Sequence, residues 1–431
     1  MLIWAIFAVS TSVSWGDAPA PEKASSPSVV RVVQTDEGWQ LLRNGEPYVI
    51  RGGGGQSHLD ALVESGGNSF RLWGTQDAQH YLDQAHARGL TVTVGFWMQH
   101  AYRGFDYTDD AARAEQLERL RRDVEKYKDH PALLIWGIGN EVELRSQDLD
   151  LILGAIEEAA ALVKSIDPNH PTMAVLAGVG RDKAKRVAEL CPSIDILGVN
   201  TYAGLRALPA QLTRQGYDGP YIVTEFGPPG HWESPKTDWG AAIELTSSQK
   251  AEVYASNYEL GVVREMPGRA LGSYAFRWGH KQERTSTWYG MFLASGERLG
   301  AADAMQTAWT GHPPDEFAPS VSGITGIEAG TTLTPDARLE VTVQSTDADG
   351  DPLEATWELR HESTDLRTGG QPESEPPIAH GAIAERDGLR ATIVTPREPG
   401  HYRLFVVVRD GTGRAGTANV PFAVTGDSTP P

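Results

Sequence analysis

Residues 47–311 alternate between short apolar, β-branched segments and longer amphipathic segments, and this cycle repeats eight times. Such alternation is typical of parallel βαβ units, in which a helix connects two neighbouring strands. The expected strands are residues 48–51, 69–73, 91–97, 133–139, 172–176, 196–202, 221–225 and 271–278. Eight units in about 265 residues match the size of a closed barrel, whereas a doubly wound open sheet would more often stop sooner. We therefore predict an α/β fold with a (β/α)8 TIM barrel at residues 31–311.

The composition of the chain changes after Gly311. The segment HPPDEFAPS is rich in proline and predicts a linker at residues 312–319. Residues 320–425 then show short alternating strands separated by turn residues, which favours a small antiparallel β-sandwich. Because few contacts usually cross an exposed linker, we expect the sandwich to be dispensable for the chemistry of the barrel.

Two segments precede the barrel strands. Residues 1–16, MLIWAIFAVSTSVSWG, form an apolar run followed by small residues placed like a signal-peptidase site, although the run carries no Lys or Arg. We predict a signal peptide at 1–16, a flexible spacer at 17–30 and export to the periplasm, the cell surface or the medium. The run is too short to span a bilayer, so we expect no stable membrane insertion. Residues 29–50 contain the NGE turn of a hairpin, which should cover the barrel floor.

Charge and reactive residues exclude several classes of function. The net charge of −19 argues against a nucleic-acid or anionic-membrane surface, since both need clustered Lys and Arg. Cys191 is the only cysteine, so no disulfide can form within the chain and a small buried hydrophobe is expected there. The sequence has no His and Asp cluster at metal-ligand spacing, no phosphate-binding glycine loop and no GxSxG elbow. We therefore expect no metal and no cofactor.

The active site of a (β/α)8 barrel lies at the carboxyl ends of its strands. In this chain those positions hold carboxylates, amides, aromatic rings and an arginine. The candidate site residues are Arg71, Trp73, Trp97, Asn140, Glu141, Asn200, Tyr202, Glu225 and Trp278. Asn140 and Glu141 follow the apolar stretch LLIWGIG, where a carboxylate is costly unless another group uses or pairs it.

Two glutamates on different strands of one barrel suit glycoside hydrolysis. One carboxyl protonates the leaving oxygen while the other attacks the anomeric carbon or activates a water. Tryptophans beside them would stack on sugar rings, and an asparagine would bind a ring hydroxyl. The expected partner is therefore a carbohydrate, either an oligosaccharide or a polysaccharide.

Several candidates have a plainer alternative role. Glu143 competes with Glu141, because strand alternation would place both on one side. Trp73 and Trp97 are as well explained by core packing, and Arg71 by an ion pair with a carboxylate. The polar loop after the last strand is a further candidate for substrate contacts, through His280, Lys281, Gln282 and Glu283.

The residues around the two glutamates resemble a known group of enzymes. Asn140 and Glu141 after the fourth strand, with VTEFG after the seventh, resemble clan A of the retaining glycoside hydrolases. IRGGGGQSHLDALVESGGNSFRLWG resembles the start of the barrel in family two of that clan, and the glucanosyltransferases of family seventy-two share a similar layout. In the second domain, STDADGDPLEATWEL and GHYRLFVVVRDGTGRAG resemble PKD-like and other immunoglobulin-like modules.

The clan A resemblance implies a role for five residues. Glu141 would be the acid/base and Glu225 the nucleophile, while Asn140 would contact the 2-hydroxyl of the sugar. Tyr202 would orient the nucleophile, and Trp278 would form the floor of the sugar-binding subsite.

These roles describe a retaining hydrolase that cleaves β-glycosidic bonds by double displacement. A transglycosylase with the same covalent intermediate is an alternative, because the outcome depends on whether water or a sugar reaches that intermediate. A non-catalytic carbohydrate-binding surface protein is a second and more distant alternative.

Overall fold

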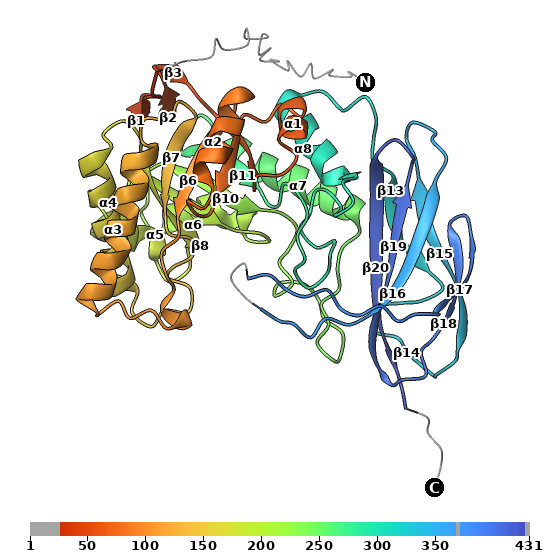
Figure 1. Ribbon diagram of the computed structural model, residues 1–431. Coiled ribbons are helices and arrows are strands. Elements are labelled where there is room, and N and C mark those ends of the chain that lie inside the picture. Colours follow the sequence, from red (N-terminus) through yellow and green to blue (C-terminus); the bar gives the residue numbers. More distant parts are fainter. Residues whose placement is uncertain (1–25, 368–370, 427–431) are drawn as a thin grey trace, which may run out of the picture.

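The computed structural model describes residues 26–367 and 371–426, which form a closed eight-stranded barrel followed by two mostly antiparallel sheets (Figure 1). The expected signal peptide at residues 1–16 and the larger part of the expected spacer at 17–30 lie outside the described residues. Within the described ranges, no helix combines the length and the apolar character needed to cross a membrane.

All strands of the barrel are parallel, in the closed order β10-β11-β4-β5-β6-β7-β8-β9. They are β4 (Ile50–Gly54), β5 (Ser69–Leu72), β6 (Thr91–Phe96), β7 (Leu133–Ile138), β8 (Thr172–Ala177), β9 (Ile196–Asn200), β10 (Tyr221–Phe226) and β11 (Ala270–Ala275). One helix follows each strand: α1 (Leu59–Glu64), α2 (Ala78–Ala87), α3 (Asp110–Tyr127), α4 (Leu149–Ile166), α5 (Lys183–Leu190), α6 (Leu208–Arg214), α7 (Ser247–Gly261) and α8 (Gly300–Thr310). The predicted (β/α)8 barrel is confirmed.

The barrel strands are apolar because both of their faces are covered. Every residue of β6 and β7 is buried, as expected for parallel strands with side chains filling the barrel on one face and helices on the other. Two strands end two or three residues earlier than predicted. β9 stops at Asn200 and β11 at Ala275, so Tyr202 and Trp278 lie in the loops that follow.

A small antiparallel sheet covers the amino-terminal end of the barrel, opposite the loops that follow the carboxyl ends of the strands (Figure 1). It consists of β1 (Val30–Thr35), β2 (Gly38–Arg43) and β3 (Glu46–Pro47). Asn44 and Gly45 form the expected turn with positive φ angles of 53° and 89°. The sheet is tied to the loops that precede β8 and β11, because the Val30 amide donates to Asn169 O and the Trp39 amide to Gly268 O.

The second domain packs two sheets around its own core. One sheet has the order β12-β20-β19-β16, with β14 also on β20, and the other has the order β13-β15-β18-β17. Their strands are β12 (Arg298–Leu299), β13 (Ser320–Thr325), β14 (Thr332–Leu333), β15 (Arg338–Thr346), β16 (Glu354–His361), β17 (Ile383–Asp387), β18 (Arg390–Val394), β19 (Gly400–Arg409) and β20 (Arg414–Val424). Trp357, Tyr402 and Phe422 are the largest residues of this separate core. Asp347 Oδ1 accepts the amides of Asp349 and Asp351, which is the hydrogen bonding of a tight turn.

The expectation that few contacts join the two domains is wrong. β12 belongs to the barrel side of the linker but pairs with β20, so one sheet of the sandwich contains a barrel segment. Leu293 and Leu299 pack on Ala415, and Arg403 Nη2 donates to Ala242 O at 2.8 Å. Figure 1 shows the sandwich lying beside α7 and α8. The two domains therefore form one continuous packed unit, which a proline-rich linker alone does not reveal.

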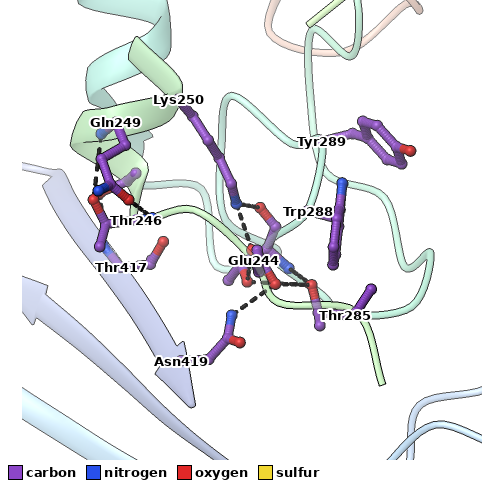
Figure 2. Close-up of polar contacts among 12 residues, drawn as sticks. Glu244, Thr246, Gln249, Lys250, Thr285, Trp288, Tyr289, Thr417 and Asn419 are labelled. Atoms are coloured by element: carbon purple, nitrogen blue, oxygen red, sulfur yellow. Dashed lines mark hydrogen bonds and ion pairs between the residues drawn. The ribbon is translucent and has the colours of Figure 1, made fainter. Parts of the chain in front are cut away.

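A buried polar network crosses the interface between the domains (Figure 2). Glu244 and Lys250 form an ion pair whose side chains are 1% and 6% exposed. Asn419 Nδ2, from β20, and Thr285 Oγ1 each donate to Glu244 Oε2 at 2.6 Å, and Thr287 Oγ1 donates to Oε1 at 2.8 Å. Burial acts to raise the pKa of Glu244, but the Lys250 ammonium, the Thr285 hydroxyl and the charge of Arg403 outweigh it, and the pKa is lowered. The sandwich therefore helps to hold the loop that contains Thr285 and Thr287.

We predict that Asn419→Leu destabilises the protein by about 1–3 kcal/mol, because Glu244 loses a donor that water cannot replace at a buried site. Urea denaturation followed by circular dichroism measures the change. Gln344→Leu is the matched control, since it makes the same kind of change on the exposed face of β15. If both variants lose the same stability, the network does not couple the domains.

Candidate active site

Glu225 lies in β10 at the centre of the barrel mouth and is held by three donors. Arg71 Nη1 donates to its Oε1 at 3.0 Å, and Trp73 Nε1 donates to the same oxygen at 2.7 Å. The Tyr202 hydroxyl donates to Oε2 at 2.9 Å. Burial raises the pKa of Tyr202 well above 10, so the phenol keeps the proton that it donates. The carboxylate of Glu225 is therefore fixed in one orientation.

Arg71 connects Glu225 to the asparagines of the site. Its side chain is 2% exposed, and Nη2 donates to Asn140 Oδ1 at 2.7 Å. Asn140 Oδ1 also accepts a bond from Asn200 Nδ2 at 3.2 Å. The alternative role considered for Arg71, an ion pair with a carboxylate, is present, and the carboxylate is Glu225. The ion pair that Arg71 forms is therefore itself part of the candidate site.

Glu141 follows β7 in a constrained backbone conformation. Its φ angle is 53°, which is uncommon for a residue with a side chain and is typical of functional positions. Asn200 Nδ2 donates to Glu141 Oε1 at 3.0 Å. Burial and then the negative charge of Glu225 raise the pKa of Glu141 to about 7. Glu141 therefore keeps its proton close to neutral pH.

Glu143, the competitor of Glu141, has a structural partner. Its carboxyl is buried, and Oε1 accepts from Lys183 Nζ at 2.7 Å and from the Ala177 amide at 2.8 Å. The chain turns directly after Asn140 instead of continuing as a strand, so strand alternation does not apply to Glu141 and Glu143. This leaves Glu141 as the carboxyl that interacts with Glu225.

Aromatic rings form a wall beside Glu225. Phe276 makes edge contacts with Trp73 and with Tyr202, each with ring centroids 5.9 Å apart. Tyr289 lies 5.5 Å from both Tyr202 and Phe276. Trp232 contacts Tyr202 at 5.6 Å and is 54% exposed, so much of its surface is open to a ligand.

The expectation that Trp278 forms the floor of a sugar-binding subsite is wrong. Trp278 has no exposed surface and packs on Phe292 and Trp309, with centroids 5.4 and 5.8 Å away. Its Nε1 donates to His58 O at 3.1 Å. Because β11 ends at Ala275, it is Phe276 that contacts the aromatic residues beside Glu225.

Trp97 lies just beyond β6 and is half-buried. Its described ring contacts are with His100 at 5.2 Å and with the Arg103 guanidinium at 5.8 Å. These contacts do not include either catalytic candidate, so a substrate contact for Trp97 stays a prediction. The other candidates on β5, β7, β9 and β10 are brought together by direct hydrogen bonds.

Sequence reasoning missed part of the wall. Phe276, Tyr289 and Trp232 lie in loops, where no hydrophobic period marks them. Arg277 was also missed, although its guanidinium lies 5.6 Å from the centre of the Trp73 ring. The polar loop after β11 gave a usable signal, since Lys281 pairs with Glu283 and lies 5.0 Å from the Phe276 ring.

The described residues hold no group of three or more His, Cys, Asp and Glu side chains that could bind a metal ion.

Comparisons with known proteins agree with this geometry. Residues 81–232 match the family described as glycosyl hydrolases family 2, TIM barrel domain. Mannan endo-1,4-β-mannosidase F of Aspergillus clavatus is 26% identical over 121 residues, which is 25% of this chain and 28% of that protein. The β-glucuronidase of Paenibacillus borealis is 26% identical over 238 residues, which is 46% of this chain and 38% of that protein. The barrel is therefore similar in sequence to glycoside hydrolase barrels.

Solved structures show the same fold. Bacteroides uniformis β-glucuronidase 2, covalently bound to cyclophellitol-6-carboxylate aziridine, has a TM-score of 0.52 and 16% identity over 92% of this chain and 48% of that chain. A family 2 β-galacturonidase from Eisenbergiella tayi, bound to galacturonate, has a TM-score of 0.52 and 15% identity over 66% of this chain and 54% of that chain. The chain thus spans about half the length of these structures and less than two fifths of the length of the curated relatives above.

The raised pKa of Glu141 predicts the pH dependence of a reaction in which Glu141 is the proton donor. The acid form is required to protonate a poor leaving group, so kcat/KM should fall about tenfold per pH unit above about 7. Initial rates on an unactivated β-glycoside between pH 5 and 9 measure this limb. Glu141→Ala, assayed on an aryl glycoside with a good leaving group, should lack the limb. A limb that persists in that variant would assign the titration to another group.

Proposed function

We propose that this chain is a retaining glycoside hydrolase that cleaves β-glycosidic bonds of an oligosaccharide or polysaccharide. The proposal rests on two buried glutamates in different environments at one barrel mouth. Glu141 has its pKa raised to about 7, which suits an acid. Glu225 accepts hydrogen bonds from Arg71, Trp73 and Tyr202, which suits an oriented nucleophile.

In the first step Glu225 attacks the anomeric carbon. A bond forms between a carboxylate oxygen and that carbon while the glycosidic bond breaks, and Glu141 gives its proton to the leaving oxygen. The sugar is then held as an ester of Glu225, and the leaving group departs as an alcohol. Glu141 remains ionised.

In the second step Glu141 acts as the base. Esterification removes the negative charge of Glu225, which is one of the two largest causes of the raised pKa of Glu141. The pKa of Glu141 is therefore lower in the intermediate, so Glu141 stays ionised and is able to take a proton from water. The water oxygen attacks the anomeric carbon, the ester bond breaks and the carboxylate of Glu225 is restored. Two inversions leave the configuration unchanged.

Asn140 is suited to bind the sugar beside the anomeric carbon. Its Oδ1 accepts from Arg71 and Asn200, which orients the amide and leaves Nδ2 as its donor toward a hydroxyl. Trp73 and Phe276 offer apolar contacts close by. This supports the contact to the 2-hydroxyl that the family resemblance implies.

The proposed substrate is a β-linked sugar, and a direct screen can identify which sugar it is. The relatives are named for mannan and for glucuronides, which are a neutral and an anionic substrate. Aryl β-mannoside, β-glucoside and β-glucuronide assayed in parallel distinguish these classes. We also propose export, on the basis of residues 1–16, and cell fractionation tests it.

The two glutamates should respond differently to substitution. Glu225→Gln should abolish turnover of every substrate, because no glycosyl ester can form. Glu141→Ala should slow hydrolysis of poor leaving groups by about 10²–10⁴-fold, yet it should still form the ester from activated aryl glycosides. Added azide should then speed release of a β-glycosyl azide, which NMR identifies.

Glu143→Gln is the matched control for these variants. Glu143 is a buried glutamate two residues from Glu141, and its partners are Lys183 and a backbone amide. The kcat of Glu143→Gln should stay within about tenfold of the parent value, since the ion pair between Glu143 and Lys183 supports the fold and not the reaction. If Glu143→Gln lowers kcat as much as Glu225→Gln does, Glu141 and Glu225 are not the catalytic pair.

A further inference from the structure

A cavity of about 730 Å³ lies between the barrel mouth and the sandwich. Both domains line it, so it exists only because the domains pack together. The main polar and aromatic lining residues are His231, Lys236, Trp239 and Arg284 from the barrel, with Ser363 and Arg403 from the sandwich. Figure 1 shows residues 362–367 and 371–382, the described parts of the segment between β16 and β17, reaching from the sandwich toward the barrel mouth. The volume lies in the range of ligand-binding sites.

The cavity is connected to the catalytic centre by aromatic contacts. The His231 ring, on the cavity wall, lies 4.9 Å from the ring of Trp232. Trp232 in turn contacts Tyr202, whose hydroxyl donates to the nucleophile Glu225. Trp232 thus contacts one residue of the reaction centre, Tyr202, and one residue of the cavity wall, His231. A ligand that extends from Glu225 past Trp232 would enter the cavity.

Buried polar atoms around the cavity lack a partner within the described part of the chain. Trp239 Nε1 and Ser363 Oγ belong to lining residues, and Glu373 Oε1 belongs to the residue that precedes the lining residue Ser374. Glu373 comes from the sandwich and is 8% exposed, and its Oε2 accepts the amide of Arg284 at 2.7 Å. An unpaired buried donor or acceptor costs about 1–3 kcal/mol, so such atoms are rare without a ligand or water. One donor, one hydroxyl and one acceptor match the hydrogen-bonding groups of a sugar.

The charges on the wall are balanced within the protein. Arg403 pairs with Glu362 at 3.0 Å, and Arg360 pairs with Glu375 at 2.9 Å. The Trp239 ring stacks on His401, with centroids 4.9 Å apart and planes 3° from parallel. The wall has as many cations (Lys236, Arg284 and Arg403) as carboxylates (Glu362, Asp365 and Glu375), so its net charge favours neither an anion nor a cation. A ligand with many neutral hydroxyls finds both donors and acceptors beside aromatic rings.

We propose that this cavity binds further sugar residues of the substrate, as a subsite that the barrel and the sandwich build together. The inference rests on the proposed function and deepens it, because it predicts that the substrate is an oligosaccharide or polysaccharide longer than a disaccharide. The sandwich then acts in substrate recognition through Glu373 and Ser363, in addition to its packing on the barrel.

Two nearly isosteric variants test the subsite. Trp239→Phe keeps the stacked ring and removes the Nε1 donor, and Glu373→Gln keeps an acceptor for the Arg284 amide while changing the unpaired acceptor. Glu385→Gln is the matched control, because Glu385 is exposed on β17 of the same domain. The full chain is used throughout, and circular dichroism checks that each variant is folded.

The first measurement compares kcat/KM on hexasaccharides with kcat/KM on an aryl β-glycoside. The probes are mannohexaose, cellohexaose and laminarihexaose. Both cavity variants should lower the ratio of hexasaccharide to aryl-glycoside activity by at least about tenfold, and Glu385→Gln should not change it. Equal losses on long and short substrates, or an unchanged ratio, would overturn the subsite.

The second measurement is binding, in the Glu225→Gln background, by calorimetry with the same hexasaccharides. At least one should bind about tenfold more tightly than the corresponding methyl β-glycoside, and the cavity variants should remove that advantage. If this binding pattern holds but the parent protein hydrolyses none of the substrates, the subsite is retained and only the proposed function is contradicted. If no hexasaccharide binds, or binding does not depend on Trp239 and Glu373, the subsite is absent.

Discussion

The buried ion pair between Arg71 and Glu225 is the interaction on which the site depends. A carboxylate and a guanidinium that are each nearly inaccessible to water are stable only when they satisfy each other and their remaining hydrogen bonds. Arg71 does this by spanning from Glu225 to Asn140, so the barrel strands β5, β7 and β10 are joined across the mouth. The charge of Glu225 raises the pKa of Glu141, whereas the Arg71 guanidinium acts in the opposite direction. The pair thus orients Glu225, and its carboxylate helps Glu141 to keep a proton.

The sandwich extends this arrangement beyond the barrel. Glu244 and Lys250 are buried at the interface, and Asn419 of the sandwich supplies one of the donors that they need. Their network holds the loop with Thr285, which follows the polar segment of Lys281 and Glu283. The loop geometry at the mouth is therefore set by both domains. The inferred subsite is a second consequence of the same packing.

Much of the fold and the centre of the site could be predicted from the sequence, because both depend on local patterns. Apolar strands that recur with helices define the barrel, and Glu141 and Glu225 stand at strand ends where such a barrel carries its chemistry. The error on Trp278 arose because the end of β11 is decided by pairing with neighbouring strands and not by its own residues. The contacts of Glu373 and Asn419 with the barrel join positions far apart in the chain, and no spacing rule reports them.

The most direct test of the account is the configuration of the first-formed product. Proton NMR recorded during hydrolysis of an aryl β-glycoside, before mutarotation, distinguishes the two anomers of the released sugar. Attack by Glu225 followed by attack of water predicts that the β-anomer appears first and the α-anomer only later. If the α-anomer appears first, water displaces the leaving group in a single step, and Glu225 is not the nucleophile.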